Sequence, residues 1–174
     1  MKRSLICVAM LTLAAGWTLT ASALQAATYS FNLIKNTFTR DTATGDVIRL
    51  SGAGQFSTGG DFVQGEGAFA IFSSGGGVEH GTWRATGFIS FERPTSDYNN
   101  PSSLNNGTQF GILSMYVTLY PRGGGQPVEN VLLVVDCPNT EQIPPEGTRV
   151  FILGGPSFSE SFAGYTVFHG QLGR

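Results

Sequence analysis

A glycine-then-aromatic element that recurs along the chain constrains the fold more than any other feature. The element appears three times, as Gly52-Ala-Gly54-Gln-Phe56, Gly65-Glu-Gly67-Ala-Phe69 and Gly81-Thr-Trp83. Successive aromatics are separated by 13 and 14 residues, which fits a hairpin meander rather than a solenoid. Glycines at positions i and i+2 lie on one face of a strand and leave a bare patch there. The aromatic that follows can cover the patch of a neighbouring strand.

These glycines allow two interpretations, and both are compatible with the sequence. In the first, glycine and aromatic are paired packing devices, and the strand glycines also allow the bends by which a sheet curls on itself. In the second, the missing side chains leave room for a ligand inside a barrel. The second interpretation predicts a site for a small apolar molecule, lined by Phe56, Phe69, Trp83 and Glu66.

Alternating apolar and polar residues predict about eight strands, and no segment has convincing helical periodicity. The expected strands cover residues 29–33, 47–56, 61–72, 79–91, 109–120, 128–136, 149–153 and 162–169. The 24 glycines and 13 phenylalanines disfavour helices, and a charged fraction of only 13% disfavours disorder. We therefore expect an all-β protein, an antiparallel β-barrel of about eight strands, with a β-sandwich as the alternative.

The alternation also assigns side chains to faces. In the fourth strand, one face is expected to carry Trp83, Ala85, Ile89 and Phe91, and the opposite, wet face His80 and Arg84. In the fifth, four apolar residues from Leu113 to Leu119 share one face and Tyr116 and Tyr120 the other. The glycine runs 75–77 and 123–125 are expected to be hairpin turns. Residues 92–106 and 138–147 read as loops, the first of them long enough to be either functional or mobile.

Residues 1–26 have the organisation of a secretory signal peptide. Lys2 and Arg3 form a basic start, residues 5–19 are apolar, and small residues suited to cleavage follow. Its removal would leave residues 27–174 as a single β-barrel domain, secreted or periplasmic, without a transmembrane segment. An outer-membrane barrel is disfavoured because the last strands look short and no aromatic girdle is evident.

Charge and composition narrow the range of partners. Without Lys2 and Arg3 the chain carries 8 basic and 12 acidic residues, and the basic ones are scattered singly. Nucleic acids and anionic membranes need a concentrated positive surface, so we expect neither as a partner. The oligomeric state stays open.

Residues that could carry chemistry are few. His80, His169 and Cys137 have no metal-ligand spacing, so we expect no metal and no cofactor. Cys137, with Asp136 and either histidine, contains the residue types of a thiol site. Neighbours in a strand point to opposite faces, however, which favours a buried thiol and a carboxylate at the strand edge. Glu66 and Glu79 are candidates for an acid–base pair, although Glu66 faces solvent if Phe69 faces the core.

The order of the glycine elements, together with Val134-Val-Asp136-Cys137 and Gly154-Gly155-Pro-Ser-Phe158, resembles exported bacterial glycine-rich all-β proteins of unassigned function. The glycine-punctuated meander is also similar in style to allene oxide cyclase and dirigent proteins, which are eight-stranded barrels around an apolar cavity. The first resemblance implies bacterial export. The function stays open between a binder of a small apolar ligand, a structural or surface-interaction domain with a solid core, and a barrel enzyme of cyclase or isomerase type.

Overall fold

A computed structural model describes residues 27–59, 62–93, 108–137 and 146–170, and this part of the chain is built from β-strands and turns. Its nine strands are β1 (Thr28–Asp41), β2 (Val47–Ser57), β3 (Val63–Ser73), β4 (Gly77–Glu92), β5 (Thr108–Gln109), β6 (Gly111–Pro121), β7 (Val128–Cys137), β8 (Gly147–Phe151) and β9 (Ser157–Gly170). None of the described residues belongs to a helix that could span a membrane.

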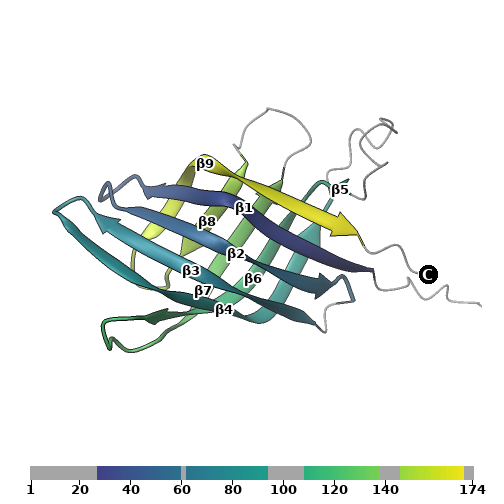
Figure 1. Cartoon of the computed structure of the whole chain (residues 1–174), viewed down its shortest axis with the longest axis horizontal. Coiled ribbons are helices and arrows are strands. Elements are labelled where there is room, and N and C mark those ends of the chain that lie inside the picture. Colours follow the sequence, from purple (N-terminus) through teal and green to yellow (C-terminus); the bar gives the residue numbers. More distant parts are fainter. Residues whose placement is uncertain (1–26, 60–61, 94–107, 138–145, 171–174) are drawn as a thin grey trace, which may run out of the picture.

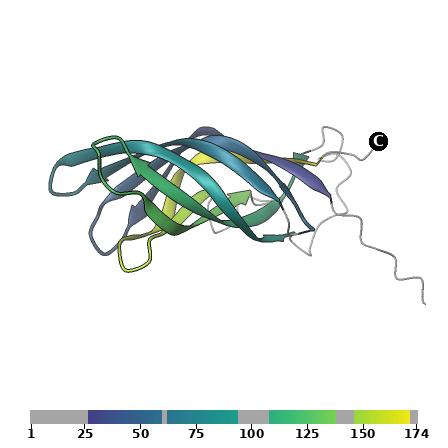
Figure 2. The ribbon, with the colours of Figure 1, turned by 90° about the horizontal axis from the view of Figure 1, so that it is seen from below.

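Eight of these strands close into an antiparallel barrel in the order β1-β2-β3-β4-β6-β7-β8-β9, and β9 pairs with β1 to complete the ring. Figure 1 shows β1 and β9 side by side although they are the first and last strands of the chain. In Figure 2 the strands wind obliquely around the long axis, as closure of a sheet into a barrel requires. The predicted barrel is confirmed, and the β-sandwich alternative is wrong.

The remaining strand, β5, covers a short part of the β9 edge that β8 leaves unpaired. β8 has five residues and pairs with β9 at only two positions, Val150 with Phe158 and Phe151 with Ser157. At the far end of β9, Phe168 pairs with Gln109 of β5. Between these two pairings the barrel has a seam where side chains replace the regular backbone ladder, and this seam is described below.

The inward faces of the strands form one hydrophobic cluster. Its members come from every barrel strand, and the largest fully buried side chains are Trp83, Phe31, Phe56, Phe158 and Phe168. On β6 the inward residues are Leu113, Met115, Val117 and Leu119, as the alternation predicted, while Tyr116 and Tyr120 are exposed. β7 is buried on both faces over much of its length, as its continuous apolar run indicated.

The assignment of faces was wrong in the second half of β4. Ile89 is 41% exposed and points away from the core, whereas Phe88 packs against it. The pairing of β4 with β6 shifts between Ala85 and Gly87 and again between Phe88 and Ser90. Each bulge adds a residue, which moves the following side chains to the other face. Trp83, Ala85 and Phe91 do face inward, as predicted.

The last strand was predicted too short. β9 runs over 14 residues and pairs with β1 from Phe158 to Gly170, although only residues 162–169 alternate clearly. The β1–β9 register shifts four times, so inward residues such as Ser161 and Thr166 are not an even number of positions apart. Bulges in both strands therefore hide the period of two from the sequence. The hairpin turns at 75–77 and 123–125 are confirmed, whereas residues 94–107 and 138–145 lie outside the described residues.

Candidate functional site

The barrel interior contains three of the four residues predicted to line a ligand site. Phe56, Phe69 and Trp83 are at most 3% exposed and belong to the central cluster. Each projects inward because it shares the inward face of its strand with the glycines that precede it. The remaining question is whether protein or free space lies beside those glycines.

The strand register places an aromatic ring on each of these glycines. Trp83 lies directly across from Gly67, which in turn lies across from Gly52. A Cβ added to Gly67 would lie 2.6 Å from Trp83 Nε1, and one added to Gly52 would lie 2.5 Å from Trp83 Cζ2. Both distances are too short for real atoms, so the indole occupies the space that two side chains would need.

The same arrangement repeats in the neighbouring rows. Phe31 of β1 faces Gly54, and a Cβ on Gly54 would lie 2.5 Å from the Phe31 ring. Phe69 faces Gly81, where an added Cβ would lie 2.6 Å from Phe69 Cζ. The interpretation of glycine and aromatic as paired packing devices therefore describes this part of the barrel, and the space beside these glycines is filled by protein.

Aromatic contacts continue from these rows toward one end of the barrel. The Phe56 ring lies 5.4 Å from Tyr29, 5.8 Å from Phe88 and 4.9 Å from Phe91, measured between ring centroids. Phe168 of β9 packs against both Phe56 and Phe91 in edge-to-face geometry. Stacked and edge-to-face rings at these separations attract one another beyond the burial of their surface.

Glu66 does not line the interior, so this placement was wrong. Its side chain is 77% exposed, and its Oε2 lies 3.9 Å from Arg84 Nη2 on the outer face. The physical reason is the alternation along β3, since Gly65, Gly67 and Phe69 face inward and the residue between the two glycines must face outward. Glu79 lies across from Ile71, whereas Glu66 lies across from Arg84, five residues further along β4. The two glutamates therefore do not form an acid–base pair.

A second polar arrangement occurs at the seam between β8 and β9. Glu146 Oε1 accepts the backbone N–H of Thr166 at 2.6 Å, as a carbonyl of a neighbouring strand would. The Thr166 hydroxyl donates to the Asp136 carbonyl at 2.6 Å, and the Ser161 hydroxyl donates to the Glu146 carbonyl at 3.1 Å. Side chains thus supply the hydrogen bonds that the short strand β8 cannot.

Buried threonines extend this seam into the interior. The hydroxyls of Thr37 and Thr148 lie 2.8 Å apart, and Thr39 Oγ1 donates to the Thr148 carbonyl at 2.5 Å. All three residues are fully buried, and among the described residues every buried side-chain nitrogen or oxygen has a hydrogen-bond partner. A fully satisfied polar network of this kind fixes strand positions and leaves few groups free for a ligand.

Burial perturbs the titration of three groups beside the seam. It raises the pKa of the Asp136 carboxyl, against the opposing effect of Arg149, whose Nη2 lies 3.1 Å from Asp136 Oδ2. It also raises the pKa of the Glu146 carboxyl. The pKa of Cys137 is raised to about 11, first by burial and then by the nearby Glu146 charge. This thiol stays protonated at neutral pH and is a poor nucleophile.

The structure does not assemble the alternative thiol site that the sequence offered. Cys137 points into the core, whereas Asp136 faces Arg149 on the other side of β7. His80 and His169 are both exposed, whereas the Cys137 thiol is buried. The prediction of a buried core thiol is thus confirmed, whereas Asp136 is itself buried and its strand is paired on both sides, so it is not an edge carboxylate. The described residues contain no group of three or more histidine, cysteine or acidic side chains able to hold a metal ion.

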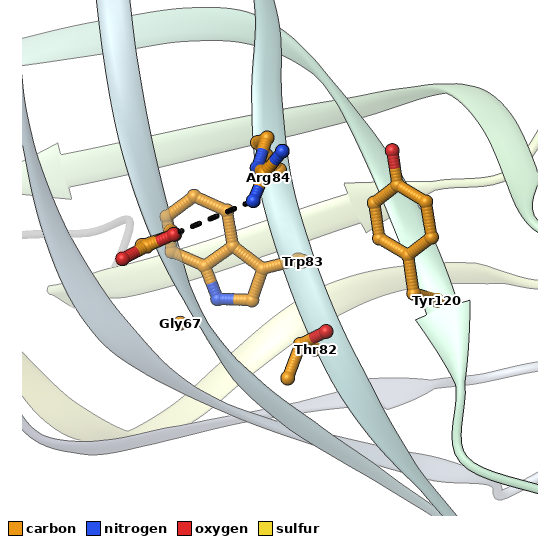
Figure 3. Close-up of a pocket in the computed structure, with 6 residues that line it drawn as sticks. Gly67, Thr82, Trp83, Arg84 and Tyr120 are labelled. Atoms are coloured by element: carbon orange, nitrogen blue, oxygen red, sulfur yellow. Dashed lines mark ion pairs between the residues drawn. The ribbon is translucent and has the colours of Figure 1, made fainter.

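The outer face of β3, β4 and β6 carries a hollow of about 550 Å³, lined by Glu66, Gly67, Thr82, Trp83, Arg84 and Tyr120. In Figure 3, Arg84 and Thr82 of β4 lie beside Tyr120 of β6, and the dashed line joins Arg84 to its acidic partner on β3. Trp83 lies beneath, as part of the core. The sequence assigned Arg84 to the wet face of its strand and Tyr120 to the face of its own strand opposite the apolar residues. The sequence did not predict that these residues share one surface, because the pairing of β3, β4 and β6 cannot be read from the alternation within a single strand.

No protein-family model, curated protein or solved structure matches this chain.

Proposed function

We propose that this protein is an exported structural or surface-interaction domain, a barrel with a solid core that acts through its outer face. The observation that carries the proposal is the filling of the interior by Phe31, Phe69 and Trp83, each lying on glycines of an adjacent strand. A ligand in that region would have to displace a packed ring. The likeness in style to barrels with an apolar cavity therefore does not extend to the space beside these glycines.

The outer face supports the same proposal. Six of the exposed large apolar side chains lie on two pairs of neighbouring strands, Ile89, Tyr116 and Tyr120 on β4 and β6, and Ile34, Phe162 and Tyr165 on β1 and β9. Exposed apolar groups that cluster rather than scatter are typical of interaction surfaces. Charged residues such as Glu66 and Arg84 stand mid-strand on the outside, the reverse of the apolar outer band of an outer-membrane barrel.

A barrel enzyme of cyclase or isomerase type has less support. The carboxylates with raised pKa values, Asp136 and Glu146, already bind Arg149 and the Thr166 backbone. Groups held in structural hydrogen bonds are poorly placed to exchange protons with a substrate.

Native mass spectrometry of the purified protein tests the solid core. We expect the bare chain mass and no saturable binding of the apolar dye N-phenyl-1-naphthylamine. The Phe69→Ala variant is the matched control, because removing a buried ring leaves an apolar cavity able to take a small hydrocarbon such as benzene. Benzene bound by the variant and not by the parent supports a filled interior. A stoichiometric apolar adduct on the parent chain would contradict it.

Export is a separate part of the proposal and rests on residues 1–26. Expression in a Gram-negative host, followed by fractionation and N-terminal sequencing, tests it. We expect a processed chain that begins near Ala27 in the periplasm or medium. An unprocessed chain confined to the cytoplasm would contradict export without affecting the argument about the core.

A further inference from the structure

The hollow on β3, β4 and β6 owes its shape to a contrast in side-chain size. The small residues Ala68 and Thr82 lie opposite each other on the outer face, next to the row in which Glu66 faces Arg84. Tyr120 faces Thr82 from β6 and closes the far side. Neighbouring strands lie about 4.8 Å apart, and residues i and i+2 lie roughly 7 Å apart along a strand. Glu66, Arg84, Thr82 and Tyr120 thus form a frame about the size of one sugar ring.

The charges of Glu66 and Arg84 cancel, but most of their hydrogen-bond donors and acceptors are available to a ligand. Glu66 and Arg84 carry opposite charges, and they approach only to 3.9 Å with exposures of 77% and 68%. Most of their donors and acceptors therefore face solvent. A carboxylate beside a guanidinium offers little net attraction to an anion or a cation, but it offers acceptors and donors to adjacent hydroxyl groups. Thr82 adds a hydroxyl to the same frame.

Tyr120 supplies an open aromatic surface beside these polar groups. Its side chain is 40% exposed, and Tyr116 is exposed on the same outer face of β6. Between them Thr118 is only 6% exposed, although its inward-facing neighbours place it on the outer face. The electron-rich face of an aromatic ring attracts the polarised C–H groups of a sugar. Ring and hydrogen-bonding pair are thus side by side, as Figure 3 shows for Tyr120 and Arg84.

From these observations we propose that the hollow is a binding site for a neutral saccharide chain. Tyr120 would stack on one face of a sugar ring, while Glu66, Arg84 and Thr82 bind its hydroxyls. This inference rests on the proposed function, since it names the ligand class of one outer surface. A peptide added as an extra strand is disfavoured, because β3 and β4 are each paired on both sides in the closed barrel and offer no free edge.

The exposed aromatic residues Phe162 and Tyr165 of β9 provide a control, because a cation already lies over each of their rings. There Lys35 Nζ lies 5.2 Å from the centroid of the Tyr165 ring, and Arg40 lies 5.0 Å from the Phe162 ring. Cations already occupy a face of each ring, whereas Tyr120 has no such partner within the described residues. In barrel order β9 lies on the opposite side from β4.

Isothermal titration calorimetry of the purified full chain tests the proposal, with cellohexaose, chitohexaose and maltohexaose as neutral probes. We expect at least one of them to bind. Tyr120→Ala and Arg84→Ala should then each weaken binding about tenfold, as loss of a contact to a ring or charged group predicts. Tyr165→Ala should leave the affinity unchanged. All three residues are exposed, so circular dichroism should show the same fold in each variant.

Three results would overturn the proposal: no heat with any of the neutral probes, equal losses in Tyr120→Ala and Tyr165→Ala, or tighter binding of an oligogalacturonate than of every neutral probe. Its failure is distinguishable from failure of the proposed function. Absence of saccharide binding in a protein without an interior adduct removes the saccharide site alone. An apolar adduct inside the parent barrel removes the solid core, whatever the sugars do.

Discussion

Trp83 and Gly67 are direct partners across β4 and β3, and the indole of the first occupies the space above the second. The indole Nε1 also donates a hydrogen bond to the Ser51 carbonyl of β2 at 2.9 Å. One side chain thus spans three strands and fixes their register. The relationship explains why glycine and aromatic recur together in the sequence.

Gly67→Ala should destabilise the barrel. The added Cβ would collide with the Ser51 carbonyl, which is backbone and cannot move aside cheaply, and with Trp83. Overpacking of a dense core costs about 1–3 kcal/mol. Urea denaturation followed by tryptophan fluorescence measures the loss in free energy of unfolding.

Gly75→Ala is the matched control for that substitution. No atom lies within 4 Å of a Cβ built on Gly75, and its backbone does not require glycine. We expect its free energy of unfolding to stay within about 0.5 kcal/mol of the parent. If both variants lose the same amount, the close packing of Trp83 on Gly67 is not what limits this position.

Trp83→Phe should also destabilise the barrel, for two reasons. The smaller ring leaves part of the space over Gly52 and Gly67 empty, and the Ser51 carbonyl loses its donor. A buried acceptor left without its partner costs about 1–3 kcal/mol by itself. The midpoint of urea unfolding by circular dichroism gives the change. An unchanged midpoint would show that the indole is not part of the packing.

The pH dependence of stability should depend on two carboxyl groups at the seam, those of Asp136 and Glu146. The raised pKa values of Asp136 and Glu146 mean that the folded state binds their protons more tightly than the unfolded chain does. Their contribution is fully present below the ordinary carboxyl pKa and is lost as the pH rises through the raised values. We therefore expect stability to increase as the pH falls from neutral through the raised values toward the ordinary carboxyl pKa. Denaturation midpoints in a pH series measure the trend.

Glu146→Gln and Asp41→Asn separate the contributions to that trend. Glu146→Gln keeps an oxygen that can accept from Thr166 N–H but no longer titrates, so the gain on acidification should shrink. Asp41 behaves oppositely, since hydrogen bonds from Ala43 and Ser157 lower its pKa and its contribution is lost at lower pH still. A pH profile that is the same in parent and Glu146→Gln would show that Glu146 does not cause the trend.

Cys137 should resist alkylation in the folded protein. Its side chain is buried and its pKa is raised to about 11, so iodoacetamide at pH 8 meets very little thiolate. Peptide mapping by mass spectrometry quantifies the label at this residue separately from Cys7. We expect little label in the native protein and complete label in urea. Rapid native labelling would mean that the β7 end of the seam opens readily.

The sequence predicted more of the fold than of the candidate site. The alternation on β6 placed Leu113 inside and Tyr120 outside, and the glycine elements indicated a curled sheet. The predicted alternation was wrong at Ile89 and incomplete along β9, because a bulge moves later side chains to the opposite face and cannot be recognised from the local sequence. Glu146 was not singled out, since nothing near it in sequence reveals that it replaces a strand carbonyl for Thr166.

The sequence by itself determined that the chain forms an all-β sheet and which residues of most strands face inward, because both follow from a period of two and from local turn chemistry. The tertiary structure alone decided what lies beside the glycines and which outer residues share one surface. Phe31 covers Gly54, and Glu66 meets Arg84, because the β1–β2 and β3–β4 hairpins each adopt one particular register. Register is a property of two paired strands and cannot be read from the alternation within either one, and the contacts between paired strands set the interior and the outer hollow.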